Sequence, residues 1–339
     1  MEETKMISVV IPCYKSSQTI RKVVEMTAQE LEDLGYPEYE FVLVDDCSPD
    51  NGETAKELKQ LSQDHSFVRS VLLAKNAGQH NALMAALNYA QGDILIGMDD
   101  DMQTHPSQIR FLLEEFNKGY DIVYGYYPEK KHSGFRNLGS YINYLSVRIL
   151  IGKPKELKTS SFWVIRKFVR DSVIEYKNPY AYLQGLFLRT TRNISCIPIK
   201  HFEREVGNSG YTFSKLVKLW SNIMGFSVVP LRTATWLGGF FAALGILGAA
   251  VVLIRKLLIP TMAMGWPSMM VAICFFSGVN LMVLGLVGEY VGRMFLGLNR
   301  EPQYVVREIL QVTEKPKVSD DICDENQLCS NNVVEEIQQ

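Results

Sequence analysis

Three consecutive aspartates, Asp99, Asp100 and Asp101, follow an apolar stretch at residues 93–98 that has the composition of a buried strand. Side chains two apart in an extended segment point the same way, so we expect Asp99 and Asp101 to face one point. Carboxylates that converge in a partly dry cleft repel each other unless a cation lies between them. Oxygen ligands suit Mg²⁺ or Mn²⁺, and such an ion can also bind substrate phosphates. The alternative is an acidic turn on a solvated surface.

The elements that would position these acids follow a strand–helix alternation through the first part of the chain. The predicted strands are residues 7–13, 40–44, 67–73, 93–98 and 121–125, and the predicted helices between them are residues 19–34, 53–65, 78–90 and 106–117. Residues 159–166 and 193–202 are two further predicted strands. This order favours an α/β fold with a mostly parallel, Rossmann-like sheet covered on both faces. Ligands bind such sheets beyond the carboxyl ends of the strands.

Polar residues follow three more of the predicted strands, at the same edge of the sheet as the aspartate triplet. Tyr14 follows the first strand, Asp45 and Asp46 the second, and Lys75 the third. An acid after the second strand could hydrogen-bond a nucleobase or a ribose, or its loop could only cap the next helix. The third helix begins close to Lys75 in the sequence, and a helix amino terminus beside a cation suits phosphate.

Composition argues against some classes of function. The net charge is −2 and there is no long Lys/Arg block, so we do not expect a nucleic-acid partner. The six cysteines have no CxxC spacing, which indicates free thiols in a reducing compartment. The amino terminus is acidic and Pro12 interrupts its first apolar stretch, so a secretory signal is not expected.

Two stretches without a charged residue, 233–254 and 269–288, are each close to the length that crosses a bilayer as a helix. The alternative is a pair of helices buried in a soluble core. Basic residues are more frequent outside the pair than between its members, which predicts that both ends are cytoplasmic. Those outside are Lys215, Lys218, Arg232, Arg293, Arg300 and Arg307, and those between are Arg255 and Lys256.

A basic segment at residues 130–152 carries Lys131, Arg136 and Ser140. Arg136 and Ser140 are four apart and share one face if the segment is helical. The segment is either a solvated basic face or a contact for an anionic lipid head group. A Gly-rich segment farther along carries Arg204 and is expected to be a mobile loop.

These patterns divide the chain into six parts and predict a multi-pass protein of the plasma membrane with its catalytic domain in the cytoplasm. The parts are a catalytic domain (1–212), a juxtamembrane amphipathic helix (213–230), two transmembrane helices (231–257 and 268–292), a cytoplasmic return segment (293–314) and a disordered acidic tail (315–339).

An ordered set of motifs resembles the inverting glycosyltransferases of family 2, which have the GT-A nucleotide-sugar fold. These motifs lie at residues 9–14, 44–50, 76–80 and 99–103. Two more, at residues 204–213 and 288–293, resemble those of the polyprenyl-phosphate glycosyltransferases. That subgroup includes dolichyl-phosphate mannose synthase, bactoprenol glucosyltransferase and the undecaprenyl-phosphate aminoarabinose-type transferases. Its bacterial relatives with two membrane helices resemble homotetramers, so a homotetramer is expected.

The resemblance implies that Pro12, Tyr14 and Asp46 line a nucleoside pocket and that Arg204 closes on the donor diphosphate. Combined with the positions above, the nucleotide-sugar-binding candidates are Pro12, Tyr14, Asp45, Asp46, Lys75, Asp100 and Arg204. The candidate ligands of a Mg²⁺ or Mn²⁺ ion are Asp99, Asp101 and Gln103. The candidate lipid-phosphate ligands are Lys131, Arg136 and Ser140, and the catalytic candidates are Asp99, Asp101 and Arg136.

The chain departs from the family pattern in three places. Lys15 and Ser16 replace the usual Asn-Glu, Gly210 replaces a common Lys, and Ser161 stands where some relatives have an Asp proposed as general base. A phosphate monoester has its second pKa near ~6, so a lipid phosphate is mostly a dianion at neutral pH. Such an acceptor needs no base to remove a proton, which makes Ser161 compatible with catalysis.

We therefore predict a metal-dependent enzyme that transfers a single sugar, with inversion, from a UDP- or GDP-type nucleotide sugar to undecaprenyl or another polyprenyl phosphate. One alternative is a glycosyltransferase that acts on a diacylglycerol or a polysaccharide. The polysaccharide synthases of this fold tend to carry a Gln-x-x-Arg-Trp motif, which residues 184–187 do not supply. Another alternative is a catalytically silent subunit that keeps the GT-A fold.

Overall fold

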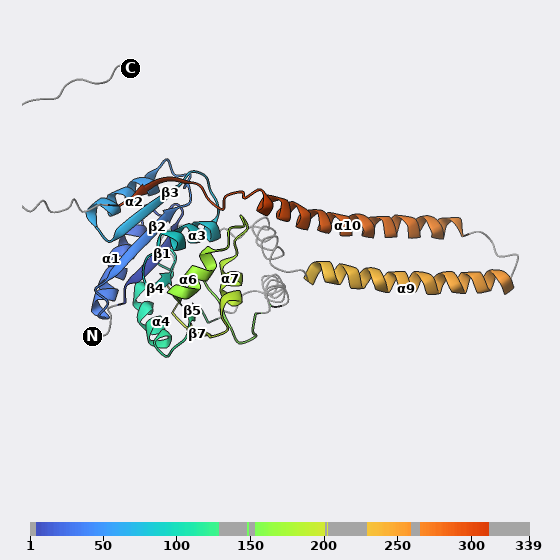
Figure 1. The fold of residues 1–339 in the computed structure, drawn as a ribbon, viewed down its shortest axis with the longest axis horizontal. Coiled ribbons are helices and arrows are strands. Elements are labelled where there is room, and N and C mark those ends of the chain that lie inside the picture. The colour runs from blue at the N-terminus through green and yellow to red at the C-terminus, as the bar shows by residue number, and fades with distance from the viewer. Residues whose placement is uncertain are drawn as a thin grey trace, which may run out of the picture.

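A single mixed sheet forms the core of the domain at one end of the protein (Figure 1). The computed structural model describes residues 5–128, 148, 153–200, 202, 229–258 and 265–311. Within these ranges the sheet has eight strands in the order β7-β5-β6-β4-β1-β2-β3-β8. The strands are β1 (Ile7–Cys13), β2 (Tyr39–Asp45), β3 (Val68–Leu73), β4 (Ile94–Gly97), β5 (Ile122–Tyr126), β6 (Trp163–Arg166), β7 (Ile194–Pro198) and β8 (Val306–Leu310).

The pairing confirms a mostly parallel α/β sheet. β1 pairs in parallel with β2 and β4, β2 with β3, and β5 with β7. The antiparallel pairs are β3–β8, β4–β6 and β5–β6. This arrangement is consistent with the GT-A fold, and it brings the carboxyl ends of β1, β2, β3 and β4 to one edge.

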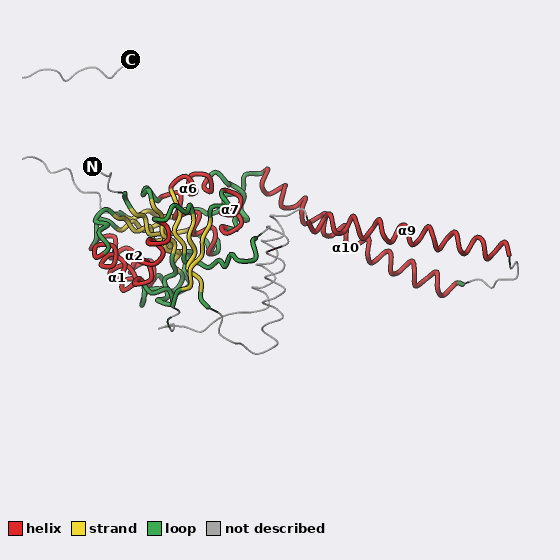
Figure 2. The backbone as a smooth tube through the Cα atoms, turned by 90° about the horizontal axis from the view of Figure 1, so that it is seen from below, coloured by secondary structure: helices red, strands yellow, loops and turns green. Residues whose placement is uncertain are grey.

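Helices cover both faces of the sheet, as the alternation of apolar residues along the strands requires (Figure 2). In β1, Val9 and Ile11 belong to one buried cluster, and Val10 belongs to the other. The first cluster is covered by α1 (Ile20–Asp33), α2 (Glu53–Asp64) and α4 (Ile109–Phe116), which follows the short 3₁₀ turn η1 (Pro106–Gln108). The second is covered by α3 (Gln79–Tyr89), α6 (Lys167–Ile174) and α7 (Leu183–Thr190).

The strand before the aspartate triplet is shorter than predicted. β4 ends at Gly97, so the aspartates lie beyond the strand rather than in an extended segment. Residues 100–104 form a bend, and Met102 adopts a left-handed backbone with φ of 61°. The interpretation of the triplet as an extended run is therefore wrong, and the direction of each carboxylate depends on the bend.

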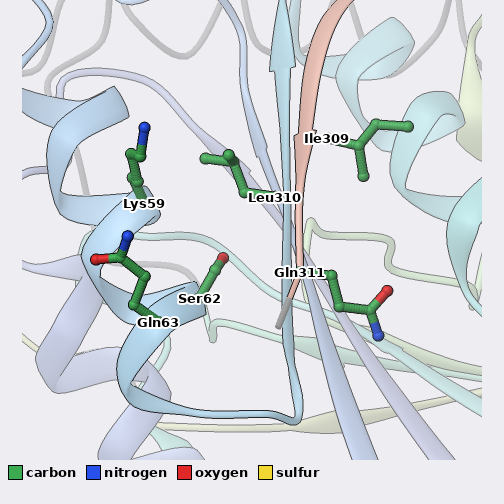
Figure 3. A pocket seen from close by; sticks show the side chains of 6 residues that line it. All are labelled: Lys59, Ser62, Gln63, Ile309, Leu310 and Gln311. Atoms are coloured by element: carbon green, nitrogen blue, oxygen red, sulfur yellow. The ribbon is translucent and has the colours of Figure 1, made fainter. Parts of the chain in front are cut away.

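The last strand, β8, was not expected in the return segment. It pairs antiparallel with β3 and closes that edge of the sheet. Figure 3 shows Leu310 directed toward α2, with Ile309 and Gln311 on the opposite side of the strand. Residues of α2 and β8 line a hollow of about 180 Å³ there. A segment more than 200 residues away in sequence thus completes the sheet.

Two long apolar helices, α9 (Val229–Leu258) and α10 (Trp266–Leu298), run side by side away from the sheet (Figures 1 and 2). Within them, residues 229–248 and 275–298 are long and apolar enough to cross a membrane, by length and composition. Their large apolar side chains, such as Trp236 and Met282, are exposed, unlike those of a helix in a soluble core. The two predicted apolar helices are confirmed, and their insertion in a membrane stays a prediction.

The carboxyl-terminal end of α10 contacts the domain. The guanidinium carbon of Arg293 lies 4.6 Å from the centroid of the Tyr180 ring. Gln303 donates hydrogen bonds to the carbonyls of Tyr176 and Asn178, at 2.7 and 2.8 Å. The motif at residues 288–293 therefore lies where the second apolar helix meets the sheet domain. Of the other predicted parts, residues 213–228 and 315–339 lie outside the described residues.

Candidate functional site

The carboxyl ends of β1, β2 and β4 meet as predicted. Cys13, the last residue of β1, pairs with Asp45, the last residue of β2, and its carbonyl accepts the backbone N–H of Asp46 at 3.0 Å. On the other side of β1, Val10 pairs with Gly97, which ends β4. The predicted clusters after these strands therefore lie at one edge of the sheet.

Asp100 is directed toward the end of β1. Its carboxylate accepts the backbone N–H of Tyr14 at 3.0 Å, and its carbonyl accepts the Thr19 hydroxyl at 2.6 Å. Burial raises the pKa of Asp100, and the neighbouring Asp101 raises it further. Asp100 thus fixes the bend against β1, and its predicted contact with a nucleotide sugar stays a prediction.

The charges of Asp99 and Asp101 both affect the pKa of Tyr127. Burial raises the pKa of Tyr127 to about 12, and the charges of Asp99 and Asp101 act in the same direction. Tyr127 shares a hydrogen bond of 2.7 Å with the Thr104 hydroxyl. The charges of both carboxylates therefore affect one phenol, and the convergence of Asp99 and Asp101 on one ion stays a prediction.

Hydrogen bonds hold both of these carboxylates. Asp99 accepts the side-chain amide of Gln79 at 3.1 Å and the hydroxyl of Ser161. Asp101 accepts the backbone N–H of Gln103 at 3.1 Å. The Ser161 position, which lacks the acid of some relatives, therefore orients Asp99.

A divalent ion fits the chemistry of this donor set. Two carboxylates with accessible lone pairs are hard oxygen ligands, and Mg²⁺ is commonly bound by one or two carboxylates together with substrate phosphates. In the described part of the chain, no three or more His, Cys, Asp or Glu side chains group together as metal ligands. The remaining ligands would come from Gln103, water or a bound diphosphate.

The second strand ends in two buried acids with different partners. Asp46 accepts the backbone N–H groups of Ala77 and Gly78, at 2.6 and 2.9 Å. Asp45 accepts the backbone N–H and the hydroxyl of Ser48, at 3.1 and 2.6 Å, and burial raises its pKa. Asp46 joins the loop after β2 to the loop before α3, whose Gly78 has a φ of +86° that side chains other than glycine rarely adopt.

The N-cap residue of α2 is Gly52, which makes no side-chain capping hydrogen bond, but Asp50 in this loop contacts the first turn of the helix. Asp50 accepts the backbone N–H of Thr54 at 3.0 Å, in the first turn of α2. The loop after β2 therefore supplies Asp46 to the edge and also contacts the first turn of α2.

Replacing Asp46 by asparagine should destabilise the protein by about 2 kcal/mol, because the amide cannot accept both N–H groups and loses the charge assistance. The measurement is the midpoint of urea unfolding. Asp33→Asn, an exposed acid bonded to Gln29 on α1, is the matched control and should change stability by less than about 0.5 kcal/mol. Equal stability of the two variants would contradict the bridging role of Asp46.

The other described candidates lie around this centre. Pro12 is in β1 opposite Val44, Tyr14 is half-exposed just beyond the strand, and Lys75 is exposed in the loop after β3. His80, in the first turn of α3, is packed edge-on against Tyr182, and burial lowers its pKa to about 4. Of the remaining candidates, Lys131, Arg136, Ser140 and Arg204 lie outside the described residues.

Sequence reasoning missed the partners that orient the acids. Gln79 lies within the motif at residues 76–80, so its position after the third strand was a usable signal. Tyr127 directly follows β5, another strand that ends at this site. Arg307, whose charge lowers the pKa of Asp45, is in β8, and nothing in its local sequence indicates that placement.

Residues 8–176 match the family model described as glycosyl transferase family 2. The chain therefore contains a glycosyltransferase domain of family 2, and this domain includes all of the described site residues discussed above except Tyr182 and Arg307.

Among solved structures, the chain is similar to glucosyl-3-phosphoglycerate synthase of M. tuberculosis, at 17% identity and a TM-score of 0.46 over 66% of this chain and 79% of that one. A second structure of that synthase, in complex with Mn²⁺, UDP-glucose and phosphoglyceric acid, has the same identity and coverage and a TM-score of 0.42. S. aureus TarS, residues 1–349, matches at 15% identity and a TM-score of 0.39 over 65% of this chain and 66% of that one. All three are distant likenesses.

Proposed function

We propose that the protein transfers a single sugar, with inversion, from a nucleotide-diphosphate sugar of the UDP or GDP type to undecaprenyl phosphate or a similar polyprenyl phosphate. The observation that carries the proposal is that Asp99 and Asp101 follow β4 at the edge where β1, β2 and β4 end, in a family 2 domain. The attached helices α9 and α10 support a lipid acceptor, because their exposed apolar surface suits a bilayer.

The donor would lie across the carboxyl edge of β1 and β2. Tyr14 offers an exposed ring next to the buried Asp45 and Asp46, an arrangement that suits a nucleoside with one stacking face and hydrogen-bonding edges. Lys75 and the amino terminus of α3 supply positive potential for phosphates.

A Mg²⁺ or Mn²⁺ ion held by Asp99 and Asp101, with Gln103, would neutralise charge on the departing nucleoside diphosphate. The chain's own residues keep these acids in place. Gln79 and Ser161 orient Asp99, the backbone of Gln103 orients Asp101, and Asp100 anchors the bend to β1. Such preorganisation lowers the cost of gathering charge at the reacting centre.

In the reaction, an oxygen of the lipid phosphate attacks the anomeric carbon as the bond from that carbon to the donor diphosphate breaks. The nucleoside diphosphate leaves with the bonding electrons, and no proton has to move because the attacking phosphate is already a dianion. Lys131, Arg136 and Ser140 would bind the lipid phosphate, and Arg204 would close on the donor. Two anions meet in this step, so cations in these positions would offset their repulsion.

Replacing Ser161 by alanine should leave at least about a tenth of the transfer rate, because the change removes one hydrogen bond to Asp99 and no base. The measurement is kcat at saturating donor and lipid. A loss of several orders of magnitude would show that the hydroxyl does more than orient Asp99.

The test of the function uses the full chain in detergent, with undecaprenyl phosphate, Mn²⁺ or Mg²⁺, and a panel of UDP- and GDP-sugars, and detects glycolipid by mass spectrometry. Parallel reactions contain a diacylglycerol or no lipid, and others contain a chelator. A product on the polyprenyl phosphate that requires the metal supports the proposal. A product only on diacylglycerol would reject the acceptor, and no product with any donor would favour a silent subunit.

Membrane topology and assembly are separate parts of the proposal. We infer a multi-pass protein of the plasma membrane with the family 2 domain in the cytoplasm, and a homotetramer. Labelling of an introduced cysteine in the connection at residues 259–264 from outside intact cells tests the topology. Light scattering of the detergent-extracted protein tests the tetramer.

A further inference from the structure

The pairing between β3 and β8 is irregular at one residue. Leu72 pairs with Glu308 and Leu73 pairs with Val306, so Arg307 lies between two successive pairs without a partner in the register. This is a β-bulge, which bends a strand and re-aims a side chain, and bulges are frequent beside active sites. The bulge changes the direction in which Arg307 would otherwise point.

The Arg307 side chain returns over the carboxyl end of β3. Its Nη2 donates to the carbonyl of Ala74 at 3.3 Å, and the backbone N–H of Ala74 donates to the carbonyl of Val305 at 2.8 Å. The same Ala74 carbonyl accepts the thiol of Cys47 at 3.7 Å. Arg307 therefore lies above the junction between the loop after β2 and the loop after β3.

The positive charge of Arg307 lowers the pKa of Asp45, the last residue of β2. Burial raises the pKa of Asp45, and Asp50 acts in the same direction, whereas Ser48 and Arg307 lower it. Arg307 thus favours the ionised form of a buried carboxylate that would otherwise be costly. It does so from a strand that enters the domain only after α10.

We propose that Arg307 is a positioning residue of the nucleotide-sugar site: the β8 bulge places its guanidinium on the Ala74 carbonyl, which also accepts the Cys47 thiol, so that Arg307 holds the loop after β2 ready for the donor nucleoside. This inference rests on the proposed function. It goes further in assigning a residue of the return segment, beyond both apolar helices, to donor recognition. The donor site is then built from segments that precede and follow the two apolar helices.

The experiment measures binding of UDP and of GDP to the full-length protein by calorimetry, together with donor KM and kcat for transfer. Arg307→Gln should weaken binding of the preferred diphosphate and raise donor KM by about tenfold, with kcat within about twofold, as expected for loss of one charge-assisted contact. Arg307→Lys, which keeps the charge, should recover part of the affinity. Glu308→Gln, the exposed neighbour in the same strand, is the matched control and should bind like wild type.

The outcomes separate this inference from the proposed function. Equal affinities of wild type and Arg307→Gln would overturn the inference and leave the proposed function intact. An equal loss in Arg307→Gln, Arg307→Lys and Glu308→Gln would also overturn it, because the effect would come from strand docking. No binding of either diphosphate by the wild type would remove the proposed function itself.

Discussion

Replacing Asp101 by asparagine should reduce sugar transfer by about a hundredfold to a thousandfold, with little change in stability. Asp99 and Asp101 both follow the end of β4, and a neutral amide in one position would halve the negative charge available to a divalent ion. Loss of one preorganised electrostatic group of this kind commonly costs a factor of ~10²–10³. Asp101 is only partly buried, so its replacement leaves the sheet intact.

The measurement combines kcat with Mn²⁺ binding in the presence of UDP, followed by electron paramagnetic resonance. Asp101→Asn should lose the UDP-dependent Mn²⁺ signal, whereas Asp93→Asn, an exposed acid before β4 that pairs with Lys167 at 3.4 Å, should keep it. Near-normal transfer by Asp101→Asn would count decisively against the role of the acid pair.

The second large effect concerns stability and involves Gly97, the last residue of β4. A Cβ atom at this position would lie 2.2 Å from Cε2 and Cζ2 of Trp163 on β6. Trp163 is buried and packs against Phe187 with ring centroids 5.1 Å apart, so the indole has no free space to enter. Gly97→Ala should therefore destabilise the protein by about 3 kcal/mol.

A loss of that size should lower the melting temperature by about 10 °C in a domain of this size, which calorimetry can measure. Gly125→Ala on β5 is a graded control, because its Cβ would approach Cδ1 of Phe162 and Cδ1 of Ile199 at 2.9 and 3.0 Å, less closely than a Cβ at Gly97 would approach Trp163. Gly125→Ala should reduce the free energy of unfolding by less than Gly97→Ala does. Equal stability of Gly97→Ala and wild type would mean that Trp163 can move, and that the end of β4 is less rigidly held than its packing indicates.

Local pattern was enough to predict most of the sheet. The apolar runs of β1 to β5 and the amphipathic helices between them are continuous in sequence, so each element carries its own signal. β8 carries a weak one: its five residues include Arg307 and Glu308, and it becomes a strand because the free edge of β3 supplies its partner. A pairing between segments more than 200 residues apart produces no signal in the local sequence.

The site likewise combines features that the local sequence predicts with features that depend on the complete fold. That acids follow β2 and β4 is visible in the sequence, because strand ends can be read from composition. The direction of Asp100 could not be predicted, since it depends on a bend at Met102 and on the backbone N–H of Tyr14. Likewise, the bonds from Gln79 and Ser161 to Asp99 need the whole sheet to bring them together.

The position of β8 has a practical consequence for anyone who wants a water-soluble fragment of this protein. Cutting the chain before α9 would remove β8 as well as the apolar helices, and β3 would be left as a bare outer strand. Unpaired outer strands recruit other chains and promote aggregation. A better fragment would replace the helical hairpin by a short flexible connector and rejoin the chain near residue 299, so that β8 can still close the sheet.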